Sequence, residues 1–138
     1  MEEYRGSVFG GFGLATDRFR VAFREISKRT GLVLVPGTLN VRLKEPVWLI
    51  PDDTVPASLG NGDEDLHYSQ GRLFRRVRGE ILSADVVMVR TSTQAEGRSK
   101  HDLKVIEIAG ATKLREDWHL ENGYVVVVSI RGLGPHVR

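Results

Sequence analysis

The sequence contains no cysteine among its 138 residues. This absence excludes a disulfide framework, a thiolate zinc site and a cysteine nucleophile. No stretch approaches the roughly 18 consecutive apolar residues that a membrane-spanning helix needs. The first residues also lack the basic start and the apolar run of a secretory signal peptide. We therefore expect a soluble, cytoplasmic protein.

The sequence also has little excess charge of either sign. Twenty Lys and Arg oppose 18 Asp and Glu, which gives a formal net charge of +2 and falls far short of a nucleic-acid coat. The length and the 41% of hydrophobic residues suit one packed core, so we predict a single, monomeric domain over residues 1–138. Glycine, in contrast, is abundant, with 15 residues where usage of about 7% is typical.

Short apolar runs separated by Gly, Pro and Asn predict a mainly β fold. We expect strands near residues 8–9, 32–35, 39–43, 47–50, 73–81, 86–89, 105–109 and 124–130. Two polar segments, 51–69 and 94–102, are predicted as surface loops. Many short strands with few helices favour a small β-barrel.

Two short helices are expected beside these strands. The first has apolar residues at the i, i+3, i+4 and i+7 spacing of one helix face, namely Phe19, Ala22, Phe23 and Ile26. Gly31 is placed to end it, although the start of the segment also alternates as a strand would. The second helix is predicted near residues 114–118, with Thr112 available as its N-cap.

A glycine-rich segment, GGFGLAT at residues 10–16, follows the first predicted strand. Glycines allow a sharp turn that brings backbone N–H groups close to an anion, so this loop is a candidate phosphate site. The plainer alternative is a turn between two strands. The segment is neither a Walker loop nor a complete GxGxxG motif, because residue 16 is threonine.

The segment PGTLN, at residues 36–40, contains a hydroxyl and an amide two positions apart. Strand alternation places Thr38 and Asn40 on the same face. Their two neutral oxygens are suited to Mg²⁺ when substrate phosphates supply further ligands and the balancing charge. The alternative is that both side chains bond to nearby backbone groups.

A glutamate, Glu107, lies between two isoleucines in a predicted strand. Alternation turns its carboxylate away from them, into solvent or into a polar cavity. Thr112, Lys113 and Arg115 follow at the start of the second predicted helix, where cationic side chains and free N–H groups favour an anion. A capped surface helix with solvated charges is the alternative.

Together these three segments resemble the archaeal-type CTP-dependent riboflavin kinase family. The resemblance is carried by residues 6–8 running into 11–13, by 36–41, by 106–109 through 113–115, and by 120, 122–123 and the closing valine strand. It implies a cradle-loop β-barrel and a kinase that uses CTP to phosphorylate the ribityl 5′-hydroxyl of riboflavin, which gives FMN and CDP.

The resemblance also implies roles for individual residues. The nucleotide would be bound by Phe12, Gly13, Leu14, Ala15, Thr16 and Asp17, and by Thr112, Lys113, Leu114 and Arg115. The expected Mg²⁺ ligands are Thr38 and Asn40. Thr93 and Glu107 would contact the flavin, and Glu107 is also the candidate catalytic residue, as an orienting group or as a general base.

Two alternatives remain open at this stage. The family's glycine loop usually continues as GxGxG, whereas the third glycine is replaced here by Ala15, so a flavin- or nucleotide-sensing module without turnover is the main rival. A nucleic-acid-binding barrel is a weaker one, suggested by the pI of about 9.1 and by the basic run Arg72, Arg75, Arg76 and Arg78.

Overall fold

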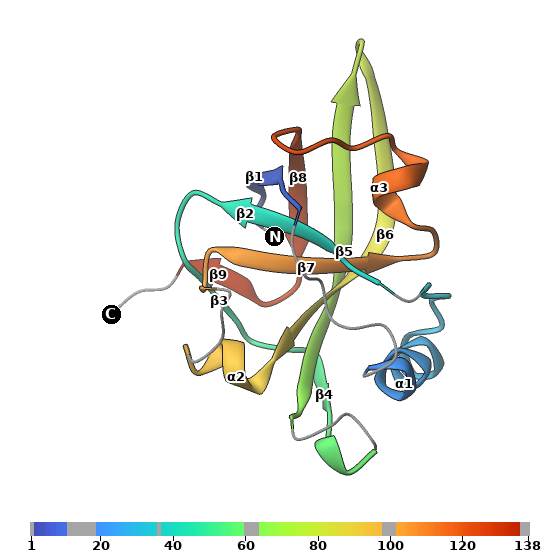
Figure 1. Ribbon diagram of the computed structural model, residues 1–138, viewed down its shortest axis with the longest axis vertical. Helices are drawn as coiled ribbons and strands as arrows, with labels where there is room; N and C mark the ends of the chain where they lie inside the picture. Colours follow the sequence, from blue (N-terminus) through green and yellow to red (C-terminus); the bar gives the residue numbers. More distant parts are fainter. Residues whose placement is uncertain (1, 11–18, 36, 60–63, 98–101, 136–138) are drawn as a thin grey trace.

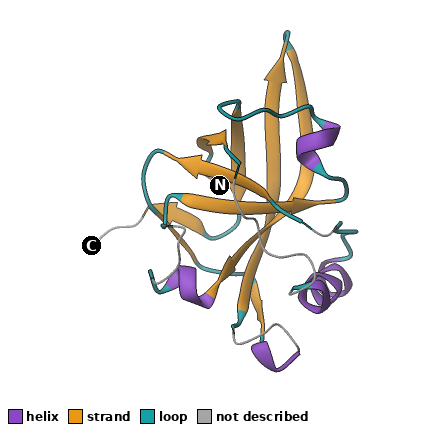
Figure 2. Cartoon of the chain, viewed as in Figure 1, coloured by secondary structure: helices purple, strands orange, loops and turns teal. Residues whose placement is uncertain are grey.

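The computed structural model describes residues 2–10, 19–35, 37–59, 64–97 and 102–135. Strands dominate these residues (Figure 2). The strands are β1 (Tyr4–Val8), β2 (Leu39–Leu43), β3 (Val47–Leu49), β4 (Asp53–Val55), β5 (Leu66–Val77), β6 (Glu80–Thr91), β7 (Val105–Gly110), β8 (Val125–Ile130) and β9 (Leu133–Pro135). The helices are α1 (Arg20–Thr30), α2 (Ser92–Ala95) and α3 (Leu114–Asp117), with a 3-10 turn, η1 (Ala57–Leu59).

Six of the strands form a closed antiparallel barrel (Figure 1). Their order is β5-β6-β7-β2-β1-β8, and β8 pairs back onto β5. Strand β4 extends the sheet at the start of β5, and β3 pairs with β9 in a separate two-stranded sheet. The prediction of a mainly β chain folded as a small barrel is therefore confirmed.

Strands β5 and β6 form a long hairpin that projects beyond the rest of the barrel (Figure 1). Arg78 and Gly79 connect them with φ angles of 50° and 83°, the left-handed pair that a two-residue hairpin turn requires. The predictions of one strand over 73–81 and a loop over 51–69 were thus wrong, because the chain turns inside the first segment and the second contains β4 and the start of β5.

Helix α1 packs against the outside of the barrel. Ala22, Phe23 and Ile26 are buried, and Phe19 immediately precedes the helix with no exposed surface. Gly31 ends the helix in a left-handed conformation, and its N–H donates to the Ser27 carbonyl. The helical interpretation of this segment is therefore confirmed over the strand interpretation.

Alternate residues of β6 and β7 belong to two different hydrophobic clusters. On the inner face of the strands, Val86, Met88, Ile106 and Ile108 fill the barrel. On the outer face, the residues that pack under helix α1 are Val87, Val89 and Ala109. Both faces of these buried strands are therefore largely apolar, because alternate side chains point to opposite sides. On the outer face, however, Glu107 of β7 is polar and lies opposite Asn40 of β2.

Three local predictions differ from the structure. Residues 32–35 form no strand, although the Val35 N–H donates to the Gly110 carbonyl. Helix α2 was not predicted; it begins where the Thr91 hydroxyl accepts the Gln94 N–H. Helix α3 begins at Leu114 as predicted, but its N-cap is Lys113 rather than Thr112; the Thr112 hydroxyl donates to Asp117 Oδ2 instead.

Candidate functional site

Three polar side chains gather on the outer face of β2 and β7. Asn40 and Glu107 are directly opposed in the β2–β7 register. The Thr38 hydroxyl, just before β2, donates a hydrogen bond of 3.1 Å to Glu107 Oε1. Glu107 is only 1% exposed, so the carboxylate expected on the polar side of its strand lies inside the structure rather than in solvent.

The amide of Asn40 supplies an unusual acceptor beside this pair. Asn40 is 4% exposed, and within the described part of the chain its Oδ1 atom is buried and accepts no hydrogen bond. An unsatisfied buried polar atom costs about 1–3 kcal/mol. A hydroxyl and an amide oxygen on one strand face are hard donors, which suit Mg²⁺, so the residues present fit this ion with phosphate or water completing its shell.

A cavity of about 250 Å³ lies between the start of β2, the end of β7 and helix α3. In Figure 1 these elements meet on the right of the barrel, with α1 below them. The cavity is lined by Val35, Gly37, Thr38, Leu39, Ile108, Gly110, Thr112, Lys113, Leu114, Arg115 and Glu116. The structure therefore brings Thr38 together with the segment 112–115 that was predicted to bind the nucleotide.

Two exposed cations line this cavity at the start of helix α3, on its N-cap residue and on its first turn. Leu114 is buried in the barrel core and anchors the helix, which leaves Lys113 and Arg115 exposed beside it. The Arg115 guanidinium donates to Asn122 Oδ1. Glu116, an acidic member of the lining, was missed by the sequence analysis, because its place in a charged surface helix gives no signal of a cavity.

The glycine loop begins beside these groups. The Phe9 N–H donates to the Asn40 carbonyl at 3.2 Å. A Cβ added at Gly10 would lie 3.5 Å from Asn122 Nδ2, and Asn122 is the partner of Arg115. The predicted nucleotide contacts at residues 12–17 lie outside the described residues, but the chain runs into that segment from Gly10, which is next to the partner of Arg115.

Thr93, the other predicted flavin contact, lies on helix α2. Its backbone N–H donates to Glu64 Oε1 at 2.9 Å. Thr93 is not among the described residues that line the cavity, whereas Thr38 and residues 112–115 are. The structure thus does not bring Thr93 into this space.

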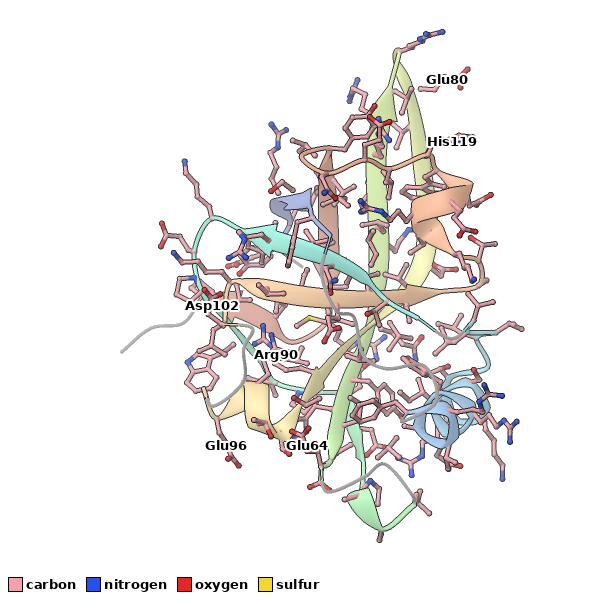
Figure 3. The ribbon with its side chains drawn as sticks, in the orientation of Figure 1. Glu64, Glu80, Arg90, Glu96, Asp102 and His119 are labelled. Carbon is pink, nitrogen blue, oxygen red and sulfur yellow. The ribbon has the colours of Figure 1, made fainter. Side chains whose placement is uncertain are left out.

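A buried arginine, Arg90, was missed by the sequence analysis. It is 1% exposed on the inner face, and its guanidinium donates to the carbonyls of Val47 at 2.9 Å and Val105 at 3.1 Å. Figure 3 shows it at the end of the barrel near α2. Burial lowers the pKa of Arg90 to about 10, against the opposing effect of the Glu107 carboxylate. The sequence signal for its burial was its position, directly after the apolar run 86–89 of the same strand.

Comparison with known families assigns the chain. Residues 8–130 match the family model of the CTP-dependent riboflavin kinase domain, whose description is "Domain of unknown function DUF120". The chain belongs to this family. The match covers all three segments that carry the resemblance, and it confirms that resemblance.

A similar protein is the riboflavin kinase of Methanocorpusculum labreanum. The two sequences are 31% identical over 107 residues, which cover 75% of this chain and 46% of the relative. The chain thus spans about half the length of that relative. Among the described residues, no helix has the length and apolar character needed to cross a membrane.

Proposed function

We propose that this chain phosphorylates riboflavin, with CTP as phosphate donor and Mg²⁺ as metal ion. The ribityl 5′-hydroxyl oxygen would form a bond to the γ-phosphorus while the bond to the β,γ-bridging oxygen breaks. FMN and CDP are the products, and the hydroxyl proton is released. Membership of the CTP-dependent riboflavin kinase family supports this reaction, as does the similarity to a riboflavin kinase.

Phosphoryl transfer depends mainly on alignment and on neutralisation of the charge that spreads over the phosphate oxygens. Lys113 and Arg115 are exposed cations on the cavity and would bind the phosphates. Thr38 and Asn40 would hold Mg²⁺, which supplies additional positive charge when bound. Because both side chains are neutral, the phosphates of the nucleotide would balance the charge of the metal ion.

The remaining roles concern the flavin and the nucleotide. Residues 12–17 would contact the nucleotide together with residues 112–115. Thr93 and Glu107 would contact the flavin, and Glu107 would orient the ribityl chain and accept the proton of its hydroxyl. Glu107 is not among the described residues that line the cavity, but it accepts a hydrogen bond from Thr38, which is, and this contact supports a place for its carboxylate near the transferred phosphate.

The observation that carries the proposal is the shared cavity. Thr38 from the start of β2 and the two cations of α3 are far apart in sequence, yet they line one space. Thr38 connects this space to Glu107 through its hydrogen bond. Glu107 is opposite Asn40, whose Oδ1 is buried and has no hydrogen bond within the described residues. A nucleotide triphosphate with bound Mg²⁺ suits this combination, because the neutral oxygens can bind the metal ion and the cations can bind the phosphates.

The test is a donor-by-donor assay of the purified chain. Riboflavin is incubated with CTP, ATP, GTP or UTP, each with and without Mg²⁺, and FMN is separated by chromatography. We expect FMN with CTP and Mg²⁺, and little without the metal ion. Quenching of riboflavin fluorescence with no FMN from any donor would contradict the kinase and favour the sensing module.

A further inference from the structure

The hydrogen bond between Thr38 and Glu107 has a direction that matters for a cation. A hydroxyl has one proton and two lone pairs. Because the Thr38 hydroxyl donates to Glu107 Oε1, its proton is committed to the carboxylate. Its lone pairs are then directed away from Glu107, and they are available to a metal ion.

The register of β2 and β7 sets this arrangement. Asn40 is directly opposite Glu107, and Thr38 lies two positions earlier on the same face. Asn40 Oδ1 is buried without a hydrogen bond from the described residues. The carboxylate that accepts from the Thr38 hydroxyl is thus also the residue opposite Asn40, whose amide oxygen lacks a donor among the described residues.

We infer that Glu107 is a positioning residue for the cation, in addition to any contact with the flavin. It fixes the Thr38 hydroxyl so that Thr38 Oγ1 and Asn40 Oδ1 present lone pairs to the same ion. This inference rests on the proposed function only for the identity of the ion. Groups that hold metal ligands in this way typically change metal affinity by about 10–100-fold when they are removed.

The test measures metal binding without turnover. Mn²⁺ replaces Mg²⁺ as the probe because it also prefers oxygen ligands, and free Mn²⁺ is quantified by electron paramagnetic resonance, with and without CDP. Glu107→Gln removes the charge and can offer an N–H to the hydroxyl, which would block a lone pair. We expect about 10-fold weaker Mn²⁺ binding or more.

Variants of Thr38 separate a positioning role from a structural one. Thr38→Val removes the hydroxyl and should weaken Mn²⁺ binding, whereas Thr38→Ser keeps the hydroxyl and should restore it. If Glu107 acts through Thr38, the double variant Glu107→Gln with Thr38→Val should bind Mn²⁺ no more weakly than Thr38→Val alone. If the fold-losses in Mn²⁺ affinity of the two single variants multiply in the double variant, the inference is overturned.

Control variants complete the design. Glu80→Gln removes one carboxylate at the tip of the β5–β6 hairpin (Figure 3), so it matches the change in net charge and should leave Mn²⁺ binding unaltered. If Glu107→Gln does not fold, Glu107→Asp decides, because it keeps the charge but withdraws the oxygen from Thr38 by one methylene. It too should weaken Mn²⁺ binding.

Two further outcomes count against the inference. Unchanged Mn²⁺ affinity in the folded Glu107 variant overturns it, and so does a wild-type chain that binds no Mn²⁺ in either condition. The FMN assay on the same preparations keeps the two proposals apart. FMN formation with an unaltered metal affinity leaves the kinase standing, whereas a Glu107-dependent metal site with no FMN from any donor leaves the inference standing.

Discussion

The two faces of strands β6 and β7 differ in what their buried side chains do. On the inner face, Met88 and Ile106 pack into the barrel, and a cation there, Arg90, donates to backbone carbonyls. On the outer face, apolar residues under α1 give way to Glu107. It lies opposite Asn40, whose Oδ1 accepts no hydrogen bond from the described residues. On one strand, therefore, the side chains that stabilise the barrel and the side chain proposed to serve the site point to opposite faces.

The largest effect is expected on the outer face. The double variant Thr38→Ala with Asn40→Ala should abolish Mg²⁺-dependent FMN formation, a fall of roughly 100-fold or more, because several kcal/mol of metal-dependent stabilisation would be lost. The measurement is the initial rate of FMN formation from CTP across Mg²⁺ concentrations. The barrel should still fold, because its inner face is unchanged, and circular dichroism checks this. Undiminished turnover would refute the metal assignment.

A substitution on the inner face should lower the stability of the fold and leave the activity of the folded protein almost unchanged. Leu73 is fully buried in the barrel on β5, so Leu73→Ala should lower the free energy of unfolding by about 2–5 kcal/mol. Urea denaturation measures this loss. FMN formation per folded molecule should change little, since Leu73 is not among the described lining of the cavity. A selective loss of activity with intact stability would break the distinction between the two faces.

The smallest effect concerns pH at the far end of the inner face. His67 is opposite Arg90 in the β5–β6 register, and its Nδ1 lies 2.8 Å from the Thr54 hydroxyl. Burial lowers the pKa of His67 below its usual 6.5, and the Arg90 charge adds to this, whereas the carboxylates of Asp65 and Glu96 oppose it.

The sign of the pH effect follows from this direction. The unfolded chain binds the histidine proton at a higher pH than the folded chain does. The contribution of His67 to stability is therefore complete above its unfolded pKa of about 6.5 and is lost as the pH falls below it. His67→Asn should flatten the pH dependence of the unfolding free energy as the pH falls below about 6.5. An unaltered slope in urea denaturation series would contradict this.

Much of the fold followed from the sequence, because alternation and turn residues are local signals. The strand at Leu39–Leu43 was predicted with the bounds that the structure has, and Gly31 ends the first helix as expected. Past the barrel end, β5 loses its alternation because both of its faces meet solvent or only partial cover. The hairpin turn was therefore missed.

The site was only partly predictable for a different reason. Sequence alternation places Thr38 and Asn40 on one face, but it does not reveal which strand lies beside them. The pairing of β2 with β7 brings Glu107 to Asn40, and this is a long-range contact with no local signal. The resemblance named all three residues, whereas the hydrogen bond from Thr38 to Glu107 came from the fold alone.

The opposition of Asn40 and Glu107 also bears on misfolding. A slip of one residue along a strand exchanges its two faces. Most positions of β7 would tolerate this exchange chemically, since both faces are largely apolar. Glu107 would not, because the slip would insert its carboxylate among the hydrophobic side chains that fill the barrel, where an unpaired charge is strongly disfavoured. The glutamate proposed to serve a ligand would thereby also exclude the wrong alignment during folding.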